Sequence, residues 1–273
     1  MKMGARISMA NIQEQLLYTT LRIERLNAQG VLQSIGTGFL LTQRVAEGAL
    51  KVHLVSNKHV LEGADSIAIT FTKSKDGEAD VGNTLRLPIA NVAANVVGHP
   101  DPDVDIAILT CTGLFNLLPN QLYFKAASYD MLATFDEPEL SVAENVYFVG
   151  YPDNRYDITN NLPLIRTGLI ASHPKYDFNG KPVFIIDAQV FPGSSGSPVY
   201  IDLTYKNMKN GQIVVGKRDI KLLGIVSATM VRNNQLKAVQ TATSFVTQEV
   251  LGLGVVFKAT AIKELIDSMP IDQ

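Results

Sequence analysis

One short segment of this chain, residues 191–200 with the sequence FPGSSGSPVY, combines the residue types that hydroxyl chemistry needs. Gly193 and Gly196 flank the serine pair Ser194 and Ser195, and a proline stands on either side of the run. Apolar stretches precede and follow it, so we predict a tight loop between two strands, with glycines where the backbone turns or approaches another group. A hydroxyl on such a loop can act as a nucleophile when a base and backbone N–H donors lie beside it. The alternative is an ordinary serine–glycine turn of a β protein.

A serine nucleophile needs an imidazole to accept its proton and a carboxylate to orient that imidazole. Of the four histidines, His53 lies within a predicted strand, and His99 and His173 each precede a proline in a predicted loop. His59 differs because it ends a strand, in the polar segment SNKHV. Among the carboxylates, Asp105 directly precedes the apolar run IAIL. We therefore expect Asp105 to be partly buried and to need a partner, for which a histidine N–H would serve.

Two other interpretations of Asp105 are open. It can be a polar residue at the start of a strand, as Asp101 and Asp103 are expected to be, or it can form a calcium loop with those two carboxylates. The segment lacks the glycine and the distal glutamate of such loops, so no metal site is predicted. Cys111 is the only cysteine, which excludes an intrachain disulfide. It follows an apolar strand without a histidine nearby, so a buried structural thiol is favoured over a nucleophile.

The elements that must position these residues are mostly short strands. Alternation of apolar and polar residues predicts a first strand at about residues 17–24, and shorter apolar runs predict strands on either side of each candidate residue. Residues 231–237 are expected to form a loop. Apolar residues recur at helical spacing only near the C-terminus, where a helix over 259–269 is predicted.

The composition excludes several classes of function. The chain has 24 basic and 26 acidic residues, and neither a basic run nor aromatic residues interleaved with lysine and arginine, so no nucleic-acid partner is predicted. No stretch approaches the roughly 18 apolar residues of a membrane span, and the first eleven residues hold no apolar run long enough for a secretory signal. These features predict a soluble, cytoplasmic protein without a cofactor or a membrane partner.

Three segments together resemble a known family. SNKHV at His59, DIAIL at Asp105 and GSSGSP at Ser195 follow one another in the order found in chymotrypsin-fold, trypsin-like serine peptidases. The nearest likeness is the peptidase domain of bacterial HtrA-type proteases. The likeness extends over about residues 15–268 and includes the motifs GTGF (36–39), VGYP (149–152), DAQV (187–190), LGIVSA (223–228) and GLGV (252–255).

The resemblance implies an all-β fold of two six-stranded antiparallel barrels in a single peptidase domain, followed by a C-terminal α-helix. The boundaries it implies are a first barrel at about 15–112, a connection at 113–144, a second barrel at 145–258 and the helix at 259–269.

The resemblance also implies a role for each candidate residue. Ser195 would be the nucleophile, His59 the general base and then acid, and Asp105 its orienting partner. The backbone N–H groups of Gly193 and Ser195 would form the oxyanion hole. Gln189 would lie at the floor of the specificity pocket, bordered by Ser227, Ala228 and Thr229, which would also pair with an extended peptide. An uncharged floor and a narrowing Thr229 favour small or medium uncharged residues before the scissile bond.

Three departures from the family pattern bear on function. Ser194 stands where secreted trypsins have an aspartate that pairs with a newly cut N-terminus, and Ser197 replaces the usual second glycine after the nucleophile. We also expect this chain to lack the PDZ module that is common in HtrA-type proteases. The sequence predicts a serine endopeptidase that hydrolyses peptides or proteins through an acyl-enzyme. The alternative, motivated by Ser194 and Ser197, is a catalytically silent peptidase-fold module that binds peptides or a partner protein. A regulatory protein partner that orders the oxyanion loop is also left open.

Overall fold

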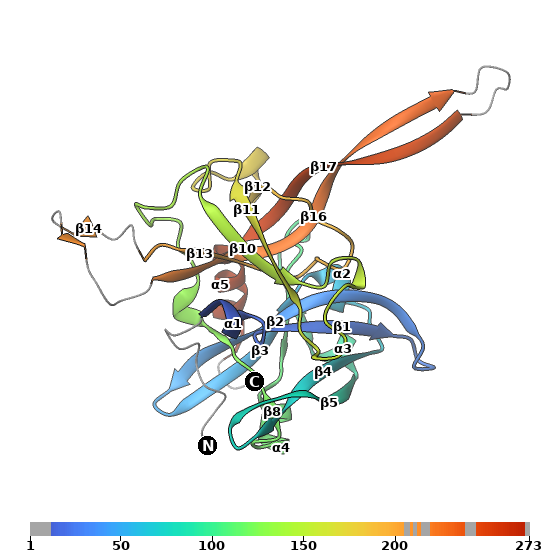
Figure 1. Cartoon of the computed structure of the whole chain (residues 1–273), viewed down its shortest axis with the longest axis vertical. Coiled ribbons are helices and arrows are strands. Elements are labelled where there is room, and N and C mark those ends of the chain that lie inside the picture. The colour runs from blue at the N-terminus through green and yellow to red at the C-terminus, as the bar shows by residue number, and fades with distance from the viewer. Residues whose placement is uncertain (1–11, 205–207, 210–211, 214–218, 238–243, 271–273) are drawn as a thin grey trace.

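A computed structural model describes residues 12–204, 208–209, 212–213, 219–237 and 244–270 of the chain (Figure 1). Strands dominate it, and a single long helix, α5 (Ala259–Ser268), follows the last strand within these residues. The predicted all-β class with a C-terminal helix is therefore confirmed. Within the same ranges, no helix is long and apolar enough to cross a membrane.

The N-terminal half forms one nine-stranded sheet, called the N-terminal sheet below. Seven strands follow one path, and β8 and β9 pair at its side with β4 and β2. Short helical turns occupy several connections. In sheet order the strands are β5 (Glu78–Ala90), β4 (Ser66–Lys75), β1 (Thr20–Leu26), β2 (Leu32–Ala46), β3 (Ala49–Ser56), β7 (Ala107–Thr110) and β6 (Val96–Gly98), with β8 (Leu122–Tyr123) and β9 (Ala127–Ser128) added; the helices are α1 (Ile12–Leu16), α2 (Lys58–Leu61), α3 (Val92–Asn95), α4 (Thr112–Leu117) and the 3-10 turn η1 (Tyr129–Met131).

The C-terminal half forms a closed six-stranded antiparallel barrel, called the C-terminal barrel below, as predicted for the second half. The N-terminal half differs from a six-stranded barrel because β6 and two-residue strands from the connecting segment extend its sheet. In barrel order the strands are β10 (Asn145–Gly150), β11 (Leu164–Ile170), β12 (Val183–Asp187), β17 (Ser244–Lys258), β16 (Ile220–Lys237) and β13 (Pro198–Asp202); β14 (Met208–Lys209) and β15 (Gln212–Ile213) pair separately, and η2 (Pro152–Asn154) and η3 (Phe178–Gly180) are 3-10 turns.

The loop predicted at residues 231–237 is wrong. These residues continue β16, and each pairs with a residue of β17 in an antiparallel ladder that runs to Lys237 and Ser244. Figure 1 shows the two strands extending together well beyond the barrel. The segment contains Arg-Asn-Asn-Gln and lacks the apolar alternation of a half-buried strand, so only its pairing with β17 makes it a strand.

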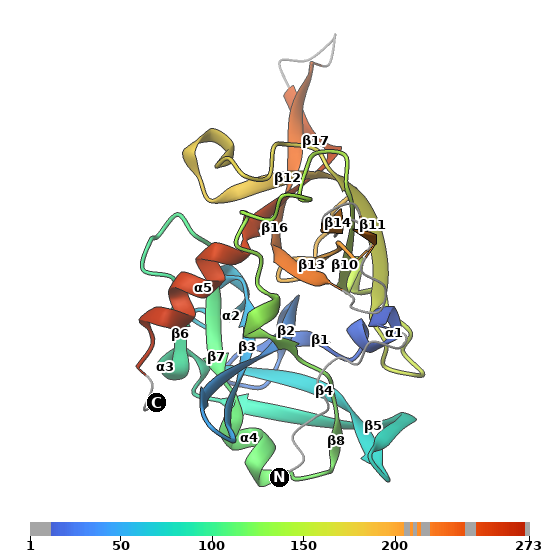
Figure 2. The same ribbon diagram turned by 90° about the vertical axis from the view of Figure 1, so that its left-hand side faces the viewer.

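One hydrophobic core joins the two halves. Phe39, Val55 and Ile108 of the N-terminal sheet belong to the same buried cluster as Phe148 and Tyr200 of the C-terminal barrel. Helix α5 adds its apolar face to this cluster through Ala259, Ala261, Ile262, Leu265 and Ile266. Figure 2 shows α5 running from the barrel toward the sheet, where Glu264 Oε2 of α5 lies 3.5 Å from Nε2 of His99, the residue after β6. The two halves are therefore held together by a shared core.

His53 is buried within the N-terminal sheet. Its ring nitrogens lie 3.2 Å from Thr110 Oγ1 and 3.4 Å from Gln43 Oε1, and the residue is only 1% exposed. Burial, reinforced by the charge of Lys51, lowers the pKa of His53 to about 4. The folded protein therefore keeps this imidazole neutral in mildly acidic solution, where an unfolded chain would protonate it.

This histidine should make folding stability sensitive to acid. Between pH of about 6.5 and 4 the unfolded chain binds a proton at His53 that the folded chain does not, so the free energy of unfolding falls as the pH falls. At pH 5 the loss from this site should be about 2 kcal/mol relative to pH 7.5. Urea unfolding at both pH values should show that His53→Gln lacks this part of the loss. His173→Gln, on a surface loop where the ring stacks on exposed Tyr176, serves as the control and should keep it; equal losses in the two variants would contradict the prediction.

Candidate active site

Antiparallel pairing of β3 with β7 brings His59 and Asp105 together. Ser56 at the end of β3 pairs with Ala107 at the start of β7, so the residues just outside each strand meet at the same edge of the sheet. His59 Nδ1 lies 2.7 Å from Asp105 Oδ2, and the His59 backbone N–H donates to Asp105 Oδ1 over 3.1 Å. An ionised carboxylate only accepts hydrogen bonds, so Nδ1 carries the proton and Nε2 of the neutral ring is left as an acceptor.

Asp105 has a further donor, which the sequence analysis assigned to the substrate pocket. Ser227 Oγ, on β16, donates to Asp105 Oδ2 over 2.7 Å. Burial of the Asp105 carboxyl opposes its ionisation, but the hydrogen bonds from His59 and Ser227 outweigh burial and hold the pKa of Asp105 below its ordinary value. The carboxylate is therefore ionised throughout the neutral range. Nothing local in the sequence links two residues 122 positions apart, so this role of Ser227 could not be found from it.

The serine loop lies between β12 and β13 and packs closely against other backbone. Gly193 and Gly196 have φ values of 86° and 87°, which glycine alone adopts readily. A Cβ atom at Gly193 would lie 2.5 Å from the Tyr151 carbonyl oxygen, and one at Gly196 would collide with the Thr37 carbonyl. The interpretation of these glycines as points of close approach therefore agrees with the structure.

Ser195 is connected to the His59–Asp105 pair by way of Ser227. Its hydroxyl donates to the Ser227 carbonyl over 3.1 Å. Within the described residues, no hydrogen bond joins Ser195 Oγ to the His59 ring. The side chain of His59 is 53% exposed, so this ring is open to solvent and to a ligand. The structure thus joins Ser195 to the His59–Asp105 pair through Ser227, which is bonded to both the carboxylate and the serine.

The backbone donors of the serine loop divide into two groups. The N–H groups of Ser194, Gly196 and Ser197 donate to the carbonyls of Phe191, Val226 and Ser194 over 2.8–3.0 Å. Across the part of the chain that the structure describes, neither the Gly193 N–H nor the Ser195 N–H has a hydrogen-bond acceptor. These are the two groups predicted to form an oxyanion hole, and they are free to bind a ligand oxygen.

The predicted pocket residues lie on neighbouring elements. Gln189 is exposed just after β12, and Ala228 and Thr229 lie on β16, where Thr229 Oγ1 donates to the Leu253 carbonyl over 3.4 Å. Thr229 pairs with Gly254 of β17. No hydrogen bond joins Gln189 to Ala228 or Thr229 among the described residues. Ala228 and Thr229 thus share one strand, and Gln189 follows β12, which is separated from β16 by β17.

Ser197 does not project into the site. It is completely buried, and a Cβ atom added at Gly150 would collide with its hydroxyl. The extra side chain is thus accommodated beneath the loop by a glycine on β10. This position removes one of the two reasons for expecting a silent module.

Two other candidate chemistries find little support. Within the described residues, no group of three or more histidine, cysteine, aspartate or glutamate side chains could hold a metal ion. Cys111 is buried at the end of β7, and burial raises the pKa of its thiol to about 12. A thiol of this kind is neutral near pH 8 and therefore unreactive.

Iodoacetamide should accordingly leave Cys111 unmodified in the folded protein at pH 8, since both the thiolate and access to it are lacking. The urea-unfolded chain should be alkylated completely under the same conditions. Mass spectrometry of the intact protein measures both. Rapid alkylation of the folded protein would contradict the structural role.

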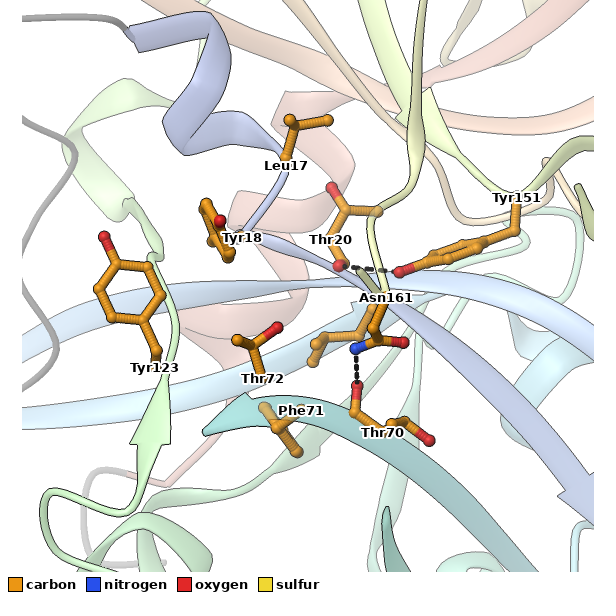
Figure 3. A pocket seen from close by; sticks show the side chains of 10 residues that line it. Leu17, Tyr18, Thr20, Thr70, Phe71, Thr72, Tyr123, Tyr151 and Asn161 are labelled. Carbon is orange, nitrogen blue, oxygen red and sulfur yellow. Dashed lines mark hydrogen bonds between the residues drawn. The ribbon is translucent and has the colours of Figure 1, made fainter. Parts of the chain in front are cut away.

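A small cavity lies at the junction of the two halves (Figure 3), and His59, Asp105, Ser195 and Ser227 are not among the residues that line it. Its volume is about 10 Å³, which is room for about one water molecule. Across it the Tyr151 hydroxyl donates to the Thr20 carbonyl over 3.3 Å, and Asn161 Nδ2 donates to the Thr70 carbonyl over 3.0 Å. The cavity is too small for a substrate, and its polar contacts join the barrel to the sheet.

Comparison with known proteins gives one family and a set of similar folds. A family model described as a trypsin-like peptidase domain matches residues 36–204, more than half of the chain. Solved structures of the Rv3671c protease from Mycobacterium tuberculosis are similar: its active form has 20% identity, covers 97% of this chain and 88% of its own, and has a TM-score of 0.46. The inactive form of a serine-to-alanine mutant of Rv3671c has 18% identity, 98% coverage of both chains and a TM-score of 0.45. No curated protein sequence matches the chain.

Proposed function

The chain belongs to the family of trypsin-like peptidase domains, which are serine peptidases, and from this premise we propose that it is an endopeptidase whose catalytic triad is Ser195, His59 and Asp105. The observation that carries the proposal is the pair of hydrogen bonds from His59 to Asp105, through Nδ1 over 2.7 Å and through the backbone N–H over 3.1 Å. Two bonds to one carboxylate fix both the position and the tautomer of the imidazole. The exposed ring leaves His59 Nε2 open to a substrate and to the Ser195 hydroxyl.

The first chemical step follows from this tautomer. Nε2 of His59 accepts the hydroxyl proton of Ser195 while Oγ attacks the carbonyl carbon of the scissile peptide bond. Ser195 Oγ must first leave the Ser227 carbonyl by rotation about χ1, a small adjustment of the kind that substrate binding brings about. The negative charge that develops on the carbonyl oxygen is stabilised by the unpaired N–H groups of Gly193 and Ser195.

Protonated His59 then gives its proton to the leaving amine as the C–N bond breaks, and the acyl group stays on Ser195 Oγ as an ester. In the second half a water molecule loses a proton to His59 Nε2 and attacks the ester carbonyl. The bond to Ser195 Oγ breaks, His59 returns the proton to that oxygen, and the new carboxyl product leaves. Asp105 remains ionised throughout and stabilises the imidazolium that forms in each half.

A peptide substrate is proposed to bind in an extended form along β16 at Ser227, Ala228 and Thr229. Gln189 offers no charge to a substrate side chain, and Thr229 narrows the approach. Small or medium uncharged residues should therefore be preferred immediately before the scissile bond.

A fluorophosphonate probe tests the proposal directly, because it is attacked only by an activated serine. The wild-type protein should be labelled at Ser195, identified by peptide mass spectrometry, and Ser195→Ala should not be labelled. A folded wild-type protein that stays unlabelled between pH 6 and 9 would overturn the proposed activity. Binding of peptides without any cleaved product would then favour the silent module.

Ser227→Ala should lower kcat without unfolding the protein. The substitution removes one of the hydrogen bonds that hold the Asp105 carboxylate, and a bond to a charged group corresponds to a loss of about 10- to 100-fold in rate. Steady-state kinetics on a peptide substrate measures the loss. Ser268→Ala, which removes a hydroxyl that only caps α5, should have unchanged kcat; a Ser227→Ala variant with the same kcat as this control would contradict the role given to Ser227.

A further inference from the structure

The direction of the Gly193 N–H depends on a hydrogen bond made by the residue before it. The Pro192 carbonyl accepts the backbone N–H of Asp153 over 2.6 Å. In a trans peptide the C=O and the following N–H point in opposite directions. As long as Asp153 holds the Pro192 carbonyl, the Gly193 N–H must therefore point away from Asp153. If this peptide turned over, a carbonyl oxygen would replace a donor in the oxyanion hole.

The turn that supplies the Asp153 N–H contains two adjacent residues in the left-handed conformation. Asp153 and Asn154 have φ values of 50° and 55°, which aspartate and asparagine adopt more readily than other residues with a side chain. The Asn154 N–H closes the turn on the Tyr151 carbonyl over 3.1 Å. The Asn154 side chain is held in addition from the opposite half of the molecule.

That support comes from Arg22 on β1 of the N-terminal sheet. Arg22 Nε donates to Asn154 Oδ1 over 2.7 Å, and the guanidinium lies 5.3 Å from the centre of the Tyr156 ring, two residues further along the same loop. The Arg22 side chain is only 11% exposed and forms an ion pair with Glu24. Glu24 also binds Arg86 over 2.7 Å, but its own ion pair with Arg22 is what holds the Arg22 guanidinium on the sheet.

We propose that Arg22 is a positioning residue for the oxyanion hole, acting through Asn154 and the Asp153–Pro192 hydrogen bond on the Gly193 N–H. This role rests on the proposed peptidase function, and it explains how the Gly193 N–H is kept pointing into the oxyanion hole. Ser194 has no carboxylate and so cannot form the ion pair that secreted trypsins make at its position. In this chain the loop is instead stabilised by Arg22 of the N-terminal sheet.

A second contact from the same sheet acts on the next peptide. Thr37 Oγ1, on β2, donates to the Gly193 carbonyl over 2.7 Å, and the Thr37 N–H donates to the Ser195 carbonyl over 2.9 Å. With these bonds the carbonyls of Pro192, Gly193 and Ser195 are all occupied by donors from outside the loop. Among the described residues, the N–H groups of Gly193 and Ser195 are the backbone N–H groups of residues 193–197 that have no hydrogen-bond acceptor.

Four variants separate positioning from general stability. Arg22→Gln removes the guanidinium that donates to Asn154 and shortens the side chain, and Asn154→Gly removes the acceptor while permitting the left-handed backbone. Asn154→Asp keeps an oxygen acceptor for Arg22 and should restore activity. Arg86→Gln is the matched control, because it removes the other arginine bound to Glu24 but has no contact with Asn154.

The readouts are kcat and KM for a peptide substrate, and the inhibition constant of a peptide boronic acid whose tetrahedral adduct places an oxygen in the oxyanion hole. We expect Arg22→Gln and Asn154→Gly to lower kcat roughly 10- to 100-fold, less than the loss of a donor itself, with KM within about twofold of wild type. Boronic acid binding should weaken by a similar factor. The double variant should be no worse than either single variant, because both residues act through one bond. Asn154→Asp and Arg86→Gln should match wild type.

Several results would overturn the proposal. One is an Arg22→Gln variant that keeps wild-type kcat and boronic acid affinity, and another is an Asn154→Asp variant as impaired as Asn154→Gly. A rise in KM at constant kcat would also overturn it, since it would place the effect in substrate binding. If Arg22→Gln does not fold, Asn154→Gly alone carries the test. Failure of the wild type to react with a fluorophosphonate would remove the peptidase function itself, whereas wild-type labelling with equal labelling of Asn154→Gly removes only the positioning role.

Discussion

Replacing Asp105 by asparagine is expected to lower kcat/KM about 10⁴-fold while leaving the protein folded. The carboxylate now accepts hydrogen bonds from His59 Nδ1, the His59 backbone N–H and Ser227 Oγ. An asparagine of the same shape can turn its NH₂ group toward Nδ1 and stabilise the tautomer that carries its proton on Nε2. That tautomer cannot accept a proton from Ser195, so the imidazole stays in place but is inactive.

Steady-state kinetics on a peptide substrate, with thermal unfolding as a check on folding, measures this effect. The matched control is Asp103→Asn, in the same loop, where the carboxylate pairs only with Lys181 over 3.4 Å at the surface. Its kcat/KM should stay within about twofold of wild type, because an exposed ion pair contributes little. An Asp105→Asn variant that kept a tenth of the wild-type activity would exclude the tautomer argument.

The largest effect is expected for Ser195→Ala, at about 10⁶-fold in kcat. The substitution removes the atom that forms the acyl bond but leaves the loop backbone, with its bonds to Val226 and Thr37, unchanged. Binding of an uncleaved peptide should therefore persist with a dissociation constant close to that of wild type. Single-turnover kinetics and peptide titration measure the two quantities separately.

The neighbouring serine provides the control for this experiment. Ser194 is 1% exposed, so it is turned into the protein rather than toward a substrate. Ser194→Ala should retain kcat within a few-fold and should retain fluorophosphonate labelling. Loss of labelling in Ser194→Ala with retention in Ser195→Ala would reverse the assignment of the nucleophile.

Site residues could be predicted from the sequence where their chemical role also leaves a local pattern in it. Gly193 and Gly196 could be recognised because a backbone that turns sharply against another strand needs glycine. Asp105 could be recognised because a carboxylate that opens an apolar strand must find a donor. His59 stood out only by its place at the end of a strand, yet antiparallel pairing of β3 and β7 carries that position to Asp105.

The remaining features depend on contacts that no local pattern encodes. Ser227 reaches Asp105 because β16 closes the C-terminal barrel beside the N-terminal sheet, and Arg22 reaches Asn154 across 132 positions of sequence. The outer part of the β16–β17 hairpin could not be predicted either, since its strands are stabilised mainly by each other. The two-residue strands β8 and β9 are too short to show any periodicity.

The shared hydrophobic core has a consequence for how the molecule comes apart. Because one buried cluster takes apolar side chains from both halves, and α5 is packed into it, the halves cannot separate without exposing this shared core, although the N-terminal half also has a second cluster of its own. We therefore expect the boundary between the halves, where the proposed triad lies, to open only with global unfolding and not by a hinge motion. Catalytic geometry and folding are lost together in a single event, and no partly opened form in which the two halves drift apart should accumulate.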